Sequence, residues 1–141
     1  MLGPEQIVEI DSPVPSDVLR ALTDRAAAQA DVDPELLFEI VTKREELCST
    51  GFGLGVAMPH VRLENIRTFH TVLGRTRKGI EFGAIDGKPV HLLLLVVGPM
   101  ADKAGYQKLM SRSARFLKAE AARVLEASDL LAITQEALAD Y

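Results

Sequence analysis

The segment Val90–Val97 constrains the fold most strongly, because His91 alone interrupts its run of apolar side chains. A strand with one face in water alternates polar and apolar residues, whereas a strand covered on both faces is apolar throughout. The segment therefore predicts a buried strand, ended by Gly98-Pro99, in a sheet that carries helices on both faces. Its uninterrupted part, Leu92–Val97, is far too short to cross a bilayer.

The rest of the chain supplies helices and further strands for such a sheet. Ser16 is the expected N-cap of the first helix, Asp33-Pro34 begins the second, and Ser128-Asp129 begins the last. Helices are expected at about 16–30, 34–47, 101–118 with a kinked continuation to 127, and 128–139. Strands are expected at about 6–10, 55–58, 70–75 and 80–82, with a loop at 62–67 and a turn at 76–79. Helices near both ends with strands between them predict an α/β fold.

Composition narrows the class of protein. The 141 residues fit one domain, and a net charge of −4 offers no electrostatic footprint for nucleic acid. Met1–Gln6 lacks the pattern of a signal peptide, and the single Cys48 excludes an intrachain disulfide and suits a reducing compartment. The three histidines lack metal-ligand spacing, so neither a metal site nor a cofactor is expected.

The stretch Thr50–His60 is the candidate site for chemistry. Three glycines alternate with large apolar residues, and Pro59 then delivers His60. The pattern predicts a glycine-rich loop, a short strand and a rigid turn that presents His60, either as a structural hydrogen-bonding group or as a nucleophile. A dinucleotide-binding fingerprint is not supported, because the glycines precede a strand instead of opening a helix.

The segment Lys43–His60 resembles the signature of one family, the IIA component of the bacterial phosphotransferase system of the fructose, mannitol and nitrogen-regulatory type. The shared pattern is close to R-E-x-x-x-[ST]-T-G-[IF]-G-x-G-[IV]-A-[IM]-P-H, and the similarity continues through Lys78–Phe82 and Asp86–Val90. The resemblance implies a single cytoplasmic IIA-type domain over residues 1–141. It also implies a mixed sheet of about five strands, flanked by helices on both sides.

The resemblance implies that His60 accepts a phosphoryl group, which would make the protein a phosphoryl-transfer component, and that Arg44 lines the site. Independently of the family, Arg44 lies on the same helix face as Leu37 and needs a partner there, which could be a local acid, the helix carbonyls or a phosphate. Further candidates for phosphate contacts are Thr50, whose hydroxyl could instead order the loop, and the backbone of Gly53 and Gly55.

The chain departs from the family at Tyr106, where the family usually has a second histidine. A phenol can donate a hydrogen bond to a phosphoryl oxygen, but it cannot become a cation near neutral pH. Tyr106 could also simply pack on its helix. Two functions therefore stay open. The first is a phosphohistidine carrier that is loaded by a histidine phosphocarrier protein and acts on a IIB component or on a regulated transporter or kinase, closest to the nitrogen-regulatory branch. The second is a IIA-like regulatory module that binds partners without transfer.

Overall fold

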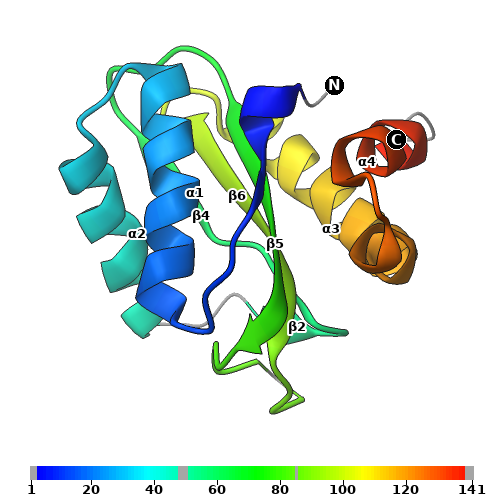
Figure 1. The fold of residues 1–141 in the computed structure, drawn as a ribbon. Helices are drawn as coiled ribbons and strands as arrows, with labels where there is room; N and C mark the ends of the chain where they lie inside the picture. Colours follow the sequence, from blue (N-terminus) through cyan, green and yellow to red (C-terminus); the bar gives the residue numbers. More distant parts are fainter. Residues whose placement is uncertain (1–2, 48–50, 85, 139–141) are drawn as a thin grey trace.

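A computed structural model describes residues 3–47, 51–84 and 86–138 of the chain. A central sheet separates two layers of helices, with α1 and α2 on one face and α3 and α4 on the other (Figure 1). The helices are α1 (Pro15–Ala30), α2 (Pro34–Leu47), α3 (Lys103–Glu126), α4 (Leu130–Leu138) and the short 3-10 helix η1 (Pro4–Gln6). The strands are β1 (Ile7–Glu9), β2 (Gly51–Gly53), β3 (Val56–Ala57), β4 (His60–Leu63), β5 (His70–Ile80) and β6 (Val90–Pro99).

The sheet is mixed, as the resemblance implied, and β6 lies at its centre. Its order is β1-β5-β6-β3-β2, and β4 also pairs with β6, beyond the end of β3. The pairs β1·β5, β3·β6 and β4·β6 are parallel, whereas β5·β6 and β2·β3 are antiparallel. The described residues form six strands instead of about five. Two strands, β2 and β4, arise where loops were expected, while the separate strand expected at 80–82 is absent because β5 runs on to Ile80.

The apolar run in β6 is buried on both faces. Leu93, Leu95 and Val97 belong to the core cluster with α1 and α2, while Leu92, Leu94 and Val96 belong to the cluster with α3. None of these six side chains is more than 4% exposed. Alternate residues of a strand point to opposite faces, so a continuous apolar run covers both layers at once.

The helix starts agree with the prediction in one case and differ in another. Asp33 caps α2, since its Oδ1 accepts a hydrogen bond from the Glu35 backbone N–H at 3.0 Å. The prediction of Ser16 as the N-cap of α1 is wrong, because the helix begins one residue earlier at Pro15, after Val14. Proline presets the helical φ at the first position, where its missing N–H costs nothing.

Three segments have more regular structure than the sequence predicted. The expected loop 62–67 begins within β4, because Val61 is buried beside β6. The expected turn 76–79 lies inside β5, where a register shift between Arg75 and Ile80 accommodates Gly79 at a φ of +74°. The helix expected to continue after a kink is one uninterrupted element, α3, which runs to Glu126. In the first two segments, tertiary burial overrides the local turn signal.

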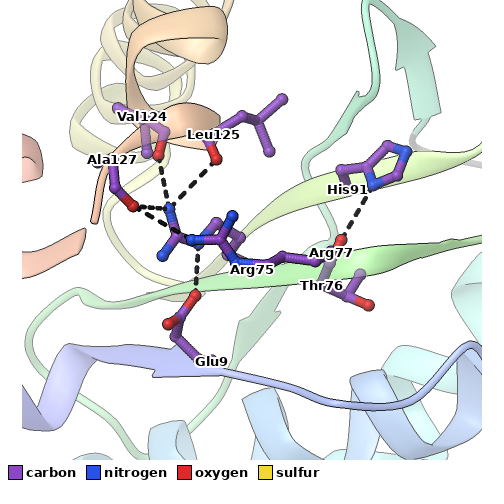
Figure 2. Close-up of polar contacts among 8 residues, drawn as sticks. All are labelled: Glu9, Arg75, Thr76, Arg77, His91, Val124, Leu125 and Ala127. Atoms are coloured by element: carbon purple, nitrogen blue, oxygen red, sulfur yellow. Dashed lines mark hydrogen bonds and ion pairs between the residues drawn. The ribbon is translucent and has the colours of Figure 1, made fainter. Parts of the chain in front are cut away.

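The buried side chain of Arg75 connects two strands of the sheet with the C-terminal end of α3 (Figure 2). Arg75, 1% exposed, forms an ion pair with Glu9 of β1. Its Nη1 donates to the backbone carbonyls of Val124, Leu125 and Ala127, at 3.0, 3.3 and 2.6 Å. These carbonyls lie at the C-terminal end of α3, where the helix dipole favours a cation. Arg75 therefore ties β1 and β5 to the end of α3.

Candidate functional site

The sheet holds His60 at the first residue of β4. His60 pairs with Val96 of β6 in parallel register, and the Val96 N–H donates to the carbonyl of Pro59 at 3.0 Å. The His60 ring is fixed as well, because its Nδ1 lies 2.8 Å from the carbonyl oxygen of Met58. The predicted rigid presentation of His60 therefore arises from strand pairing together with this hydrogen bond.

The hydrogen bond to Met58 assigns the tautomer of His60. A carbonyl oxygen only accepts, so Nδ1 must carry the hydrogen and Nε2 is left with its lone pair. Burial lowers the pKa of His60 below its ordinary value of 6.5, and the neighbouring Arg44 cation lowers it further, while the bond to Met58 acts in the opposite direction. The net shift favours a neutral ring with a nucleophilic Nε2 near pH 7.

The structure brings Arg44 to His60. The Nη2 of Arg44, in the last turn of α2, lies 3.4 Å from the Nε2 of His60. Both side chains line an open pocket between α2, β4 and the start of α3. The lining residues are Ile40, Arg44, His60, Val61, Arg62, Lys103, Tyr106 and Gln107.

Tyr106 lies in the same pocket and also packs on the core. Its ring centroid is 6.2 Å from that of His60, with the ring planes at 50°. The ring packs partly against the α3 core cluster and rests on β6 at Gly98, where an added Cβ would lie 2.6 Å from the Tyr106 Cδ1. Burial raises the pKa of Tyr106, although the Arg44 and Arg62 cations act against the rise. The phenol is therefore neutral at physiological pH.

Two further cations line the pocket, and the sequence analysis missed them. Arg62 lies two residues after His60 on the same strand, and Lys103 lies three residues before Tyr106 on α3. These spacings put Arg62 on the same side of its strand as His60, and Lys103 on the same side of its helix as Tyr106. That spacing is the sequence signal that could have identified Arg62 and Lys103. Within residues 3–47, 51–84 and 86–138, no ion pair joins Arg44, Arg62 or Lys103 to a carboxylate.

The glycine candidates lie elsewhere along the sheet. Gly53 and Gly55 are absent from the lining of the pocket. The carbonyl of Gly55 accepts hydrogen bonds from the N–H groups of His91 and Leu92 in β6. Leu92 lies four residues before Val96, the residue of β6 that pairs with His60. Four strand residues span roughly 13 Å, so Gly55 meets β6 well away from His60. Thr50, the remaining candidate, falls outside the described residues.

The described part of the chain contains neither a cluster of metal-ligating side chains nor a membrane-spanning helix. No cluster of three or more His, Cys, Asp or Glu side chains there is arranged to hold a metal ion. No helix there is long and apolar enough to span a bilayer.

Comparison with known proteins identifies a matching family and several similar proteins. Residues 4–134 match the profile of the family described as phosphoenolpyruvate-dependent sugar phosphotransferase system, EIIA 2. A nitrogen regulatory protein from Bradyrhizobium diazoefficiens is 33% identical over 100 residues, which are 71% of this chain and 65% of that protein. The match therefore spans slightly less than two thirds of that relative's length.

Solved structures share the fold at low sequence identity. The crystal structure of nitrogen regulatory protein IIA-Ntr from Neisseria meningitidis has a TM-score of 0.85 and 24% identity, covering 94% of this chain and 93% of that chain. The complex of enzyme IIAMTL and phosphorylated enzyme IIBMTL from Escherichia coli matches with a TM-score of 0.78 and 18% identity, covering 100% and 99%. The mixed sheet with helices on both sides is thus the fold of IIA proteins.

Proposed function

Because the chain belongs to the phosphotransferase-system EIIA 2 family, we propose that it is a phosphohistidine carrier in which the Nε2 of His60 accepts the phosphoryl group. One observation carries the assignment to this atom. The His60 Nδ1 is bonded to a carbonyl, while Nε2 keeps its lone pair beside Arg44, in a pocket whose cations have no carboxylate partner among the described residues.

The proposed transfer balances without any additional proton. The Nε2 lone pair of His60 forms the new N–P bond as the N–P bond to the donor's histidine breaks, and that electron pair stays on the donor ring. The donor ring, which carries a proton on its other nitrogen, leaves as neutral imidazole, and the His60 ring, still protonated at Nδ1, becomes cationic. The Met58 carbonyl accepts a hydrogen bond from the Nδ1–H group and so stabilises this positive charge. The reaction is therefore one of positioning and charge compensation.

Arg44 is the proposed first contact of the phosphoryl oxygens. A guanidinium offers planar paired donors that match phosphate geometry, and its Nη2 is already 3.4 Å from the attacking nitrogen. Before transfer, the same cation disfavours protonation of His60, which keeps the nucleophile in its neutral form. Arg44 therefore supports both the nucleophile and the product.

The proposed donor is a histidine phosphocarrier protein. Two kinds of acceptor are consistent with the relatives. The similarity to a nitrogen regulatory protein supports regulation of a transporter or kinase according to phosphorylation state, and the fold shared with the IIAMTL–IIBMTL complex supports onward transfer to a IIB component. We favour the regulatory role, because the relative from Bradyrhizobium diazoefficiens is a nitrogen regulatory protein.

The test is phosphorylation in a reconstituted relay driven by phosphoenolpyruvate, with purified enzyme I and several phosphocarriers, read by intact mass at neutral or basic pH. We expect one added phosphoryl group, absent in His60→Ala and retained in the control His70→Ala. Arg44→Gln should slow labelling by roughly tenfold or more, since a contact to the transferring group is lost. Unchanged labelling in His60→Ala would falsify the proposal.

A second candidate function rests on Tyr106. The family usually supplies a second histidine here, and a neutral phenol cannot replace an imidazolium. The chain could therefore be a regulatory binding module without transfer. No added mass with any donor, beside a labelled control IIA protein, would favour this alternative. Partner affinity would then be unchanged in His60→Ala.

A further inference from the structure

Arg62 and Tyr106 form a pair inside the candidate pocket. The Arg62 guanidinium carbon lies over the Tyr106 ring, 5.5 Å from its centroid, and both side chains are half-buried. We propose that Tyr106 is a positioning residue whose aromatic face, not its hydroxyl, holds Arg62 as the second cation for the phosphoryl group on His60. This inference rests on the proposed carrier function and extends it to the group that replaces the family's second histidine.

The backbone register brings the two side chains together. Arg62 of β4 pairs with Gly98 of β6, and the Tyr106 ring rests on Gly98 because that residue has no Cβ. The Tyr106 ring therefore lies beside the strand position that carries Arg62. Parallel pairing also places Arg62 two residues after His60, on the same side of the strand. The pair thus lies next to the proposed acceptor.

The ring is held from the helix side as well. Asp102 caps α3 by accepting the Gly105 N–H at 2.9 Å, and its carbonyl accepts the Tyr106 N–H at 3.0 Å. The ring itself packs partly against the α3 core cluster. A platform fixed at both its backbone and its ring loses little freedom when a cation lies on its face, which suits a positioning role.

Charge favours a second guanidinium beside the phosphoryl group, in addition to the positive charge that the His60 ring gains on transfer. A phosphoryl group on nitrogen carries close to two negative charges at neutral pH, and Arg44 supplies a single positive charge. Arg62 supplies another, and no ion pair to a carboxylate of the described residues competes for it. A neutral phenol beneath Arg62 does not repel the anion. The Arg62–Tyr106 pair therefore presents a cation where Tyr106 alone presents none.

The experiment compares initial rates of His60 phosphorylation in the reconstituted relay. Tyr106→Phe keeps the aromatic face and should remain within about twofold of wild type, whereas Tyr106→Leu and Arg62→Gln should each lose about tenfold, in the range of a partly desolvated cation–π contact. The loss should fall on kcat more than on KM, since Arg62 contacts the transferring group. Arg67→Gln removes an exposed cation outside the pocket and is the matched control.

Coupling between the two residues provides a second criterion. The double variant Tyr106→Leu/Arg62→Gln should be no slower than Arg62→Gln alone, because both changes remove the same cation. Losses that multiply would overturn the proposal, as would Tyr106→Phe being as slow as Tyr106→Leu, which would assign the role to the hydroxyl. Tyr106→Leu at the wild-type rate would show that the ring is not needed.

Failure of the carrier function is distinguishable from failure of the pair. If wild type is never labelled while a control IIA protein is, both proposals fall. If wild type is labelled and Tyr106→Leu matches it, the pair alone is rejected. A titration of the Tyr106 phenol by ultraviolet absorbance, with Tyr141→Phe in every protein so that Tyr106 is the one tyrosine left, tests the contact without any donor. Its pKa should rise further in Arg62→Gln, because the Arg62 cation holds that pKa down, and an unchanged value would count against the contact.

Discussion

Replacing Arg75 with methionine should destabilise the protein severely, although Arg75 contacts the C-terminal end of α3 and the candidate pocket lies at its N-terminal end. Its guanidinium joins Glu9 of β1 to the carbonyls at the end of α3, where the Nη2 of Arg77 makes one further contact with the carbonyl of Ala127 at 3.3 Å (Figure 2). Methionine fills much of the same volume but donates no hydrogen bond. The carbonyls of Val124 and Ala127 would then lose a charged donor in a buried region.

The magnitude follows from the geometry. Nη1 carries two hydrogens, so the three carbonyls near it share two donated bonds, each worth about 1.5–3 kcal/mol because the donor is charged. Relief from burying the guanidinium offsets part of that loss, and Nη2 has no hydrogen-bond partner among the residues that the structure describes. The carboxylate left behind on Glu9 is 55% exposed, so it adds little further cost. We expect a net loss of roughly 3 kcal/mol.

The assay is urea unfolding followed by circular dichroism, with Glu9→Gln as the matched control. Gln keeps an acceptor for Arg75 and removes only the exposed charge, so its cost should be about 1 kcal/mol or less. Arg75→Lys keeps the charge without the planar fork and should fall between the two. Equal losses in Glu9→Gln and Arg75→Met would refute the reasoning, because the ion pair would then outweigh the bonds to α3.

Three further outcomes are expected. The His60 ring should titrate below 6.5 by NMR, and its pKa should rise in Arg44→Gln, since that variant removes a repelling cation; a lower value there would contradict the assigned geometry. Gly98→Ala should cost about 1–3 kcal/mol in urea unfolding, because the new methyl would meet the Tyr106 ring, and a neutral effect would show that the ring moves easily. The pKa of the Glu9 carboxyl lies below 4.5 in the folded state, chiefly because Arg75 donates a hydrogen bond to it. Wild type should therefore be more stable than Glu9→Gln by the full amount above pH 4.5, and this advantage should disappear as the pH falls through the folded-state pKa. An advantage that persists in strong acid would exclude this linkage.

The helices and the central strand could be predicted because their signals are local. The apolar run in β6 predicts burial on both faces, and Asp33-Pro34 marks the start of α2 within one residue. The segment around Thr76 misled the sequence analysis for the opposite reason. Its charged residues and Gly79 resemble a turn, but Arg75 and Thr76 are buried, and their side chains bond to partners 49 or more residues away, so β5 continues. No local pattern reports such partners.

The candidate site divides in the same way. The sequence by itself determined the family, the motif that ends at His60 and the helical position of Arg44, because each depends on residues close together in the chain. The resemblance had already made Tyr106 a candidate, but only the tertiary structure placed Arg62 and Lys103 around the same pocket. These residues come from a strand and a helix that meet beside the end of β6, and the register of β4 against Gly98 decides which side chains face each other. That register is set by hydrogen bonds between strands distant in sequence, which the order of residues alone does not reveal.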